Sequence, residues 1–163
     1  MSITRFFFLF AFLLLSAITI QAKTTTNALQ CRAIHISDGD SFTCLTNNHK
    51  RIKVRLVGID APENGQVYGK QAKQQLAKLI HKQSVTLKID GIDQYARRLA
   101  TVYDMQHQNI NRLMVESGYA WAYRFYKKDP QYQQAQLEAQ WKKRGLWQDR
   151  HPQEPYLWRK EQR

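Results

Sequence analysis

The sequence predicts an α+β fold in which five strands close a small β-barrel and three α-helices pack beside it. Its 163 residues, 43% of them hydrophobic, are enough for one domain with a core and too hydrophobic for a disordered chain. Apolar residues switch between alternating and helical spacing along the chain. The first three predicted strands follow one another directly, and a helix separates the third from the fourth.

Alternation of polar and apolar residues predicts the strands. The clearest case is the third strand, where apolar residues face one way and the charged residues between them face the other. The five predicted strands span residues 31–36, 41–45, 51–57, 84–89 and 98–103. Turn residues separate them, and Asp90-Gly91 is expected to end the fourth. This order is typical of a five-stranded OB-type β-barrel.

Helical spacing predicts three helices, at residues 69–81, 111–117 and 131–144. In the first, Ala72, Leu76 and Ile80 form one apolar stripe that faces the core. Gly118 and Gly145 follow the second and third helices, where glycine is a common C-terminal cap.

The N-terminus has the features of a secretory signal peptide. Arg5 precedes an apolar run over residues 6–20, and the small residue Ala22 follows it. This run is shorter than the roughly 20 apolar residues that span a membrane, which favours cleavage over an uncleaved anchor. We therefore expect a signal peptide at 1–22, one folded domain at 23–150 and a polar tail at 151–163. The mature chain would be secreted or periplasmic, without stable membrane association.

Export determines how the two cysteines are interpreted. Cys31 and Cys44 flank the turn at Asp38-Gly39, so they lie on neighbouring strands if that turn joins a hairpin. In an oxidising compartment we predict a disulfide between them. The alternative is a pair of buried free thiols. Two cysteines without an adjacent histidine do not make a zinc site.

The formal net charge of +12 at pH 7 favours a polyanionic partner. That partner is either nucleic acid or an anionic membrane surface, because net charge governs association rather than fold.

Carboxylates gather where predicted strands begin and end. Asp40 begins the second strand and Asp60 follows the third. If these strands pair, their ends bring the two side chains to one rim of the barrel. Two carboxylates, a backbone carbonyl and water suit Ca²⁺, which prefers oxygen ligands. The alternative is that these aspartates only shape turns.

Glu63, Arg55 and Arg97 complete what phosphodiester cleavage requires. Near a metal-bound phosphate, Glu63 can orient or deprotonate a water molecule. Each guanidinium can hold a phosphate through two parallel hydrogen bonds. The ordinary alternatives are an exposed glutamate and surface salt bridges.

A series of motifs resembles the staphylococcal nuclease (thermonuclease) family, and the similarity covers about residues 30–147. The motifs are Asp38-Gly39-Asp40-Ser41, the stretch 55–63, the stretch 93–97, Gly118-Tyr119-Ala120-Trp121 and Gly145-Leu146-Trp147.

The resemblance implies an OB-type barrel with three helices and a Ca²⁺-dependent nuclease that acts on DNA and RNA. It implies cleavage of the bond to the 5′ oxygen, which leaves 3′-phosphate ends. Asp40 and Asp60 would bind the metal through carboxylates, and Ala61 through its backbone carbonyl. Glu63 would act on the attacking water.

The resemblance also assigns contacts to the substrate. Arg55 and Arg97 would clamp the phosphate, and Tyr95 and Tyr126 match aromatic positions that line the nucleotide pocket. Arg98 adjoins Arg97, but motif spacing favours Arg97. We expect a monomer.

Three positions depart from the family pattern. Ala96 stands where glycine is usual, and a positive φ there would cost about 1–2 kcal/mol. Gln94 replaces a frequent basic residue and Arg124 a frequent aromatic one. We expect both to lower affinity for a terminal phosphate without removing catalysis.

Two other functions are compatible with parts of the sequence. A catalytically inactive nucleic-acid-binding barrel would use positive charge alone. Such a module would typically have lost Glu63 or an arginine, and this chain retains them. The third hypothesis, a membrane-surface protein, is supported only by the positive charge and the apolar N-terminus.

Overall fold

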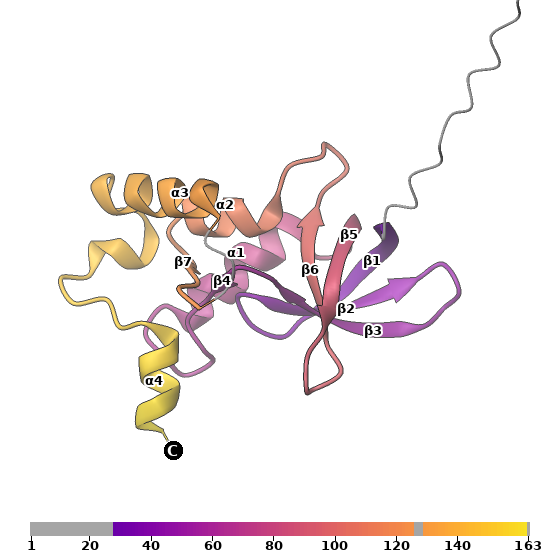
Figure 1. Cartoon of the computed structure of the whole chain (residues 1–163), viewed down its shortest axis with the longest axis horizontal. Helices are drawn as coiled ribbons and strands as arrows, with labels where there is room; N and C mark the ends of the chain where they lie inside the picture. Colours follow the sequence, from indigo (N-terminus) through magenta and orange to yellow (C-terminus); the bar gives the residue numbers. More distant parts are fainter. Residues whose placement is uncertain (1–27, 126–128, 163) are drawn as a thin grey trace, which may run out of the picture.

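The structure, a computed structural model, describes residues 28–125 and 129–162 (Figure 1). The predicted signal peptide lies outside the described residues. The elements are β1 (Ala28–Ile36), β2 (Ser41–Thr46), β3 (Arg51–Leu56), β4 (Ile59–Asp60), α1 (Gly69–Ile80), β5 (Ser84–Ile92), β6 (Arg98–Tyr103), α2 (Ile110–Glu116), β7 (Trp121–Ala122), α3 (Pro130–Trp141), the 3₁₀ helix η1 (Gly145–Gln148) and α4 (Pro155–Glu161).

The predicted barrel is confirmed. Its strands close in the order β1-β2-β3-β6-β5, and β5 pairs back with β1. All pairs are antiparallel except β3 with β6, which run parallel. The prediction that Asp90-Gly91 ends a strand is wrong, because β5 continues to Ile92. A register shift between Ile89 and Gly91 absorbs the turn-forming residues as a bulge.

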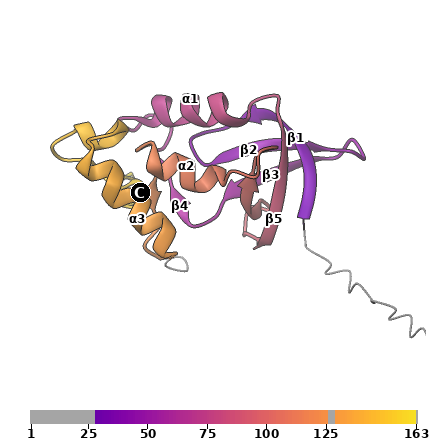
Figure 2. The ribbon, with the colours of Figure 1, turned by 90° about the horizontal axis from the view of Figure 1, so that it is seen from above.

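The helices lie on one side of the barrel, as Figures 1 and 2 show from two directions. α2 contacts α1, α3 and β6, and α1 also contacts β1. The short strands β4 and β7 pair with each other, which links the segment after β3 to the segment after α2. No helix within residues 28–125 and 129–162 combines the length and hydropathy that crossing a membrane requires.

The C-terminal segment differs from the prediction of a polar tail. Pro155 opens a further helix, α4, where its fixed φ suits the first turn. Of the seven residues of α4, only Pro155 is buried. The apolar residues Tyr156 and Leu157 remain 37% and 43% exposed, so the helix rests on the domain through few buried contacts.

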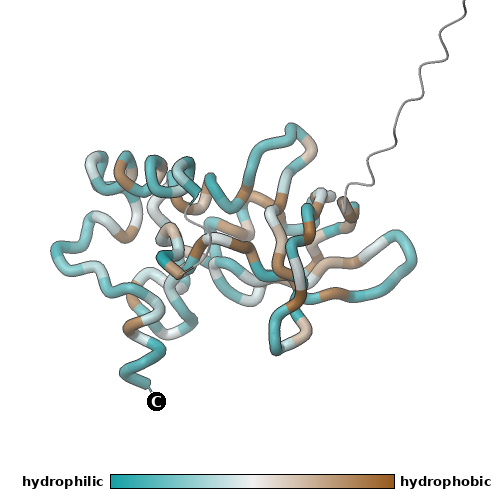
Figure 3. Tube along the Cα trace, in the orientation of Figure 1, coloured by the Kyte–Doolittle hydropathy of each residue, from teal (hydrophilic) through white to brown (hydrophobic). Residues whose placement is uncertain are grey.

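One core fills the barrel and continues beneath α1 and α2. Figure 3 shows hydrophobic stretches along the strands and hydrophilic ones in most of the loops. The predicted stripe of Ala72, Leu76 and Ile80 is fully buried. The largest buried side chains are Phe42, Leu56, Ile59, Leu76, Ile80, Leu87, Ile110 and Met114. The core therefore fixes the strand ends that carry the polar residues described below.

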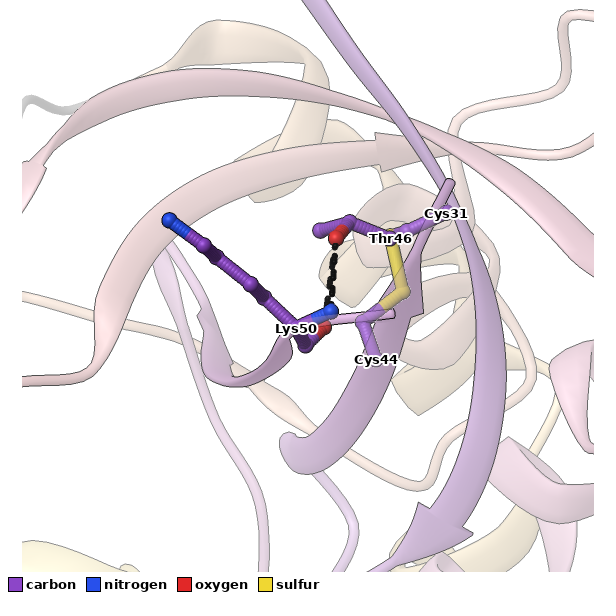
Figure 4. The surroundings of a disulfide bond; sticks show 4 residues. All are labelled: Cys31, Cys44, Thr46 and Lys50. Carbon is purple, nitrogen blue, oxygen red and sulfur yellow. Dashed lines mark hydrogen bonds between the residues drawn. A yellow bond between two sulfur atoms is a disulfide. The ribbon is translucent and has the colours of Figure 1, made fainter. Parts of the chain in front are cut away.

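The predicted disulfide joins Cys31 to Cys44, whose Cα atoms are 5.8 Å apart. The two residues are diagonal neighbours rather than directly opposite, because Cys44 pairs with Ala33 in the β1–β2 ladder. Figure 4 places the bond beside the turn after β2, where the Lys50 N–H donates to Thr46 Oγ1 at 3.2 Å. The bridge ties the first two strands together inside the core.

Candidate active site

The ends of β2, β3 and β4 bring Asp40 and Asp60 together. Ser41 lies opposite Arg55 in the β2–β3 ladder, so the start of β2 is beside the end of β3. The Ala61 N–H donates to Asp40 Oδ2 at 2.9 Å, which places the Asp40 side chain against the backbone that follows Asp60. Each aspartate is only 2% exposed.

One guanidinium spans both aspartates. Arg55 donates from Nη1 to Asp40 Oδ1 and from Nη2 to Asp60 Oδ1, the second at 2.9 Å. Burial by itself lowers the pKa of Arg55, but the charges of Asp40 and Asp60 raise it above its ordinary value. The single guanidinium of Arg55 thus bonds the carboxylates of both Asp40 and Asp60.

Negative charge is crowded at this rim. Burial, and then the charge of Asp40, raise the pKa of Asp38 to about 7. Burial also raises the pKa of Asp60, and Asp40 adds to this rise, while Arg159 and Arg55 oppose it. The rim therefore favours the binding of positive charge.

The donor set fits a hard divalent cation. Within the described ranges, no group of three or more His, Cys, Asp or Glu side chains is arranged to hold a metal ion. Two buried aspartates that share one guanidinium beside the Ala61 backbone form a smaller set of oxygen donors. Ca²⁺ accepts such a set because backbone carbonyls and water can complete its coordination. Zinc sites are instead built mainly from histidine nitrogen and cysteine sulfur.

Backbone packing fixes the position of Glu63. The Glu63 N–H donates to Gln66 Oε1 at 3.0 Å, and the Gln66 N–H donates to the Glu63 carbonyl at 3.0 Å. A Cβ atom on Gly69 would lie 1.9 Å from that carbonyl oxygen. Only glycine lets α1 begin so close to the loop that carries Glu63.

Arg159 of α4 joins Glu63 to Asp60. Its Nη1 donates to Asp60 Oδ1 at 3.0 Å and to Glu63 Oε1 at 2.6 Å, and its Nη2 donates to Asp60 Oδ2 at 3.0 Å. Burial by itself lowers the pKa of Arg159, but the bonds to both carboxylates raise it. The sequence contained a signal for the helix, a proline that suits the first helical position, but none for the direction of this arginine.

Arg97 reaches the same site from the turn between β5 and β6. Its Nε donates to Asp93 Oδ2 at 2.7 Å and its Nη1 to Ser41 Oγ at 3.4 Å. Ser41 Oγ in turn donates to Asp40 Oδ1 at 3.0 Å. Ala96, just before Arg97, has a φ of 59°, the strained conformation considered above.

A cavity of 380 Å³ opens beside the arginines and is lined by Arg55, Arg97, Tyr95, Tyr123 and neighbouring residues. Tyr95 is 67% exposed, and the Arg97 guanidinium lies 5.4 Å from its ring centre. Tyr123 is held there because its N–H donates to the Gly58 carbonyl at 2.9 Å. Tyr126, the second aromatic residue assigned from the sequence, lies outside the described residues.

Buried Asn111 supports the site from behind, which the sequence did not reveal. Its Nδ2 donates to the carbonyls of Val57 and Ala100 at 2.9 and 3.1 Å. Its Oδ1 accepts from the Val102 N–H at 3.0 Å. Asn111 thereby ties the turn between β3 and β4 to β6 and α2.

Comparison with known proteins gives consistent matches. Residues 53–149 match the family model described as "Staphylococcal nuclease homologue". An "Uncharacterized endonuclease" of Haemophilus influenzae is 48% identical over 150 residues, covering 92% of this chain and 84% of the relative. A "Micrococcal nuclease" of Shigella flexneri is 42% identical over 137 residues, covering 78% of each chain. "Protein ParB" of Escherichia coli is 37% identical over 155 residues, covering 89% of this chain and 87% of the relative.

Proposed function

This chain belongs to the staphylococcal nuclease family, and from that premise we propose that it is an exported, Ca²⁺-dependent nuclease that hydrolyses phosphodiester bonds of DNA and RNA. Relatives named as endonuclease and micrococcal nuclease support the nuclease function itself. The convergence of Asp40, Asp60 and Glu63 on the guanidinium groups of Arg55 and Arg159 supports the proposed cation site and general base.

The proposed cation ligands are the carboxylates of Asp40 and Asp60 and the backbone carbonyl of Ala61. When bound there, Ca²⁺ would polarise a phosphoryl oxygen and offset the charge that develops on it. Oxygen donors and near-complete burial of both aspartates support this assignment.

The chain's own residues divide the remaining chemistry. Glu63 accepts a proton from the attacking water, for which a carboxylate held in place by its backbone is suited. Arg55 and Arg97 donate hydrogen bonds to the non-bridging phosphate oxygens and favour the transition state, where charge on them is greatest. Water attacks phosphorus as Glu63 takes its proton, the bond to the 5′ oxygen breaks, and that oxygen takes up a proton from solvent as it leaves. The products are a 3′-phosphate and a 5′-hydroxyl.

The cavity beside Arg55 and Arg97 is the proposed nucleotide pocket. Tyr95 and Tyr123 offer aromatic faces on which a base can stack without sequence preference. The net charge of +12 supports binding of either nucleic acid. No base-edge contact is required, which favours a substrate range that includes both DNA and RNA.

Export is proposed from the N-terminal sequence, and the Cys31–Cys44 disulfide supports it because such bonds persist in oxidising compartments. The mature chain is proposed to be a monomer without stable membrane association. Mass spectrometry of protein from the periplasm or medium should find an N-terminus near residue 23. An intact Met1 on that protein would contradict cleavage.

The decisive experiment is digestion of plasmid DNA, denatured DNA and RNA by the purified mature chain. Cleavage should require added Ca²⁺, stop with chelator and leave 3′-phosphate ends. Retarded migration without cleavage would instead support the inactive binding barrel. If the protein neither cleaves nor retards nucleic acid, both functions are ruled out.

Substitutions locate the activity. Glu63→Gln and Arg97→Ala should each lower the rate by at least about a hundredfold while the fold survives. The matched controls are Glu116→Gln, in the Arg112 ion pair on α2, and Arg98→Ala, the neighbouring arginine on β6. Equal rates for all four variants and the parent would show that the site lies elsewhere.

A further inference from the structure

The C-terminal helix places a cation on the carboxylates that the proposed function assigns to Ca²⁺ and to the attacking water. α4 lies beyond residues 53–149, the segment that matches the family model. Its Arg159 covers both oxygens of Asp60 and one oxygen of Glu63, with donor–acceptor distances between 2.6 and 3.0 Å. The side chains meet across a sequence separation of 99 residues in the case of Asp60.

Arg159 donates two of the three hydrogen bonds that Asp60 accepts from arginines. Oδ1 accepts from Arg55 and Arg159, and Oδ2 accepts from Arg159. A divalent cation on the same oxygens would lie within a few ångströms of the guanidinium. Like charges at that distance repel strongly in a partly buried site, because solvent screens them only in part. The Arg159 guanidinium and a divalent cation therefore compete for Asp60.

The anchoring of α4 allows such an exchange. The helix buries only Pro155, and its N-cap residue Glu154 makes no side-chain capping bond. Outside Arg159, the described residues hold its neighbourhood through contacts of modest strength. They include the Arg124–Glu154 ion pair, the Phe125–Tyr156 ring contact at 5.0 Å and a hydrogen bond from Gln66 Nε2 to the Gln153 carbonyl at 2.8 Å. The exposed ion pair adds little stability, because solvent screens its charges.

We propose that α4 is an autoinhibitory strap whose Arg159 competes with the divalent cation for Asp60 and Glu63. The strap leaves the carboxylates when the cation binds, so it sets the cation concentration at which the nuclease becomes active. The proposal rests on the proposed function, because it takes Asp60 as a cation ligand.

The direct test is Ca²⁺ affinity, measured by isothermal titration calorimetry without substrate. Arg159→Gln removes the charge and leaves a shorter, neutral polar side chain. Lys160→Gln removes an equal charge from the next position of α4, which is exposed and makes no ion pair in the described chain. Arg159→Gln should bind Ca²⁺ at least about tenfold more tightly than the parent, whereas Lys160→Gln should match the parent.

Hydrogen exchange of residues 155–161 provides a second readout that needs no catalysis. In the parent, saturating Ca²⁺ should speed exchange of these amides. In Arg159→Gln they should exchange rapidly with or without Ca²⁺. Circular dichroism of each variant checks that the barrel remains folded.

The possible results distinguish failure of the strap from failure of the proposed cation site. Equal, measurable Ca²⁺ affinity in the parent and Arg159→Gln, or weaker binding by the variant, would overturn the strap and leave the cation site intact. Absence of binding in every variant would remove the cation site and the strap together. Binding by Arg159→Gln alone would support competition in its strongest form.

Discussion

Replacement of Asn111 by alanine should destabilise this protein more than any single exposed substitution. The side chain is fully buried and makes three hydrogen bonds, to the backbone of Val57, Ala100 and Val102. Alanine removes the partner of the Val102 N–H and of the Val57 carbonyl. Each buried polar group so deprived costs about 2 kcal/mol, so the expected loss is about 4 kcal/mol.

Urea unfolding of the parent and variant measures this loss, and a matched control lies two residues away. Asn109 caps α2 by accepting from the Arg112 N–H at 3.0 Å. Loss of such a cap costs about 1 kcal/mol, so Asn109→Ala should be much the milder change. Thermal unfolding should show the same order, with a drop of about 12 °C for Asn111→Ala.

The same substitution tests the link between the turn and the site. Because Asn111 holds the Val57 carbonyl, its loss should loosen the turn that leads to Asp60. At a temperature where both variants are fully folded, Asn111→Ala should cleave DNA more slowly than Asn109→Ala. Equal unfolding free energies for the two variants would refute the hydrogen-bond accounting, and equal cleavage rates would refute the positioning role.

Three further predictions follow from other parts of the chain. The double variant Cys31→Ala/Cys44→Ala should lose about 3 kcal/mol of unfolding free energy, and reduction of the parent should have a similar effect in calorimetry. Ala96→Gly should raise the unfolding free energy by about 1 kcal/mol, because alanine is strained at a φ of 59°; a lower value would mean that the turn tolerates alanine. Burial raises the pKa of the Tyr132 phenol above its ordinary value, so the folded state disfavours the phenolate. The associated stability is complete below about pH 10 and is lost as pH rises through the folded pKa, and an unfolding titration in alkali should find Tyr132→Phe less sensitive than the parent.

The barrel was predictable because burial leaves a periodic trace in the sequence. In β3 the inward residues Val54 and Leu56 are buried, while Arg51 and Lys53 before them are exposed, as alternation predicts. The bounds of β6 agree with the predicted strand at 98–103. The approach of Asp40 to Asp60 also followed from the order of the strands, since adjacent antiparallel strands bring their ends together.

Contacts that depend on packing between distant segments left no such trace. A Cβ atom on Gly39 would lie 2.7 Å from the Cβ atoms of both Ala61 and Ala72. Glycine at that position therefore lets α1 and the loop after Asp60 both pack closely against the turn before β2, beyond its role in that turn. The hydrogen bonds of Asn111 are equally invisible, because an asparagine within a short helix is ordinarily interpreted as a solvent-facing residue.

The three arginines of the site differ in how firmly the fold holds them. Arg55 extends from a barrel strand and is 18% exposed, and Arg97 is fixed through its side chain and its backbone N–H by Asp93. Arg159 is the most exposed of the three, at 32%, and projects from the helix with the least buried surface. A cation that binds at this rim should therefore displace Arg159 more readily than Arg55 or Arg97. In the proposed mechanism the same displacement would free Glu63 to accept a proton, so cation binding and activation of the base would be one event. Saturating Ca²⁺ should therefore restore full cleavage to the parent, whereas at low Ca²⁺ Arg159→Gln should be the faster enzyme.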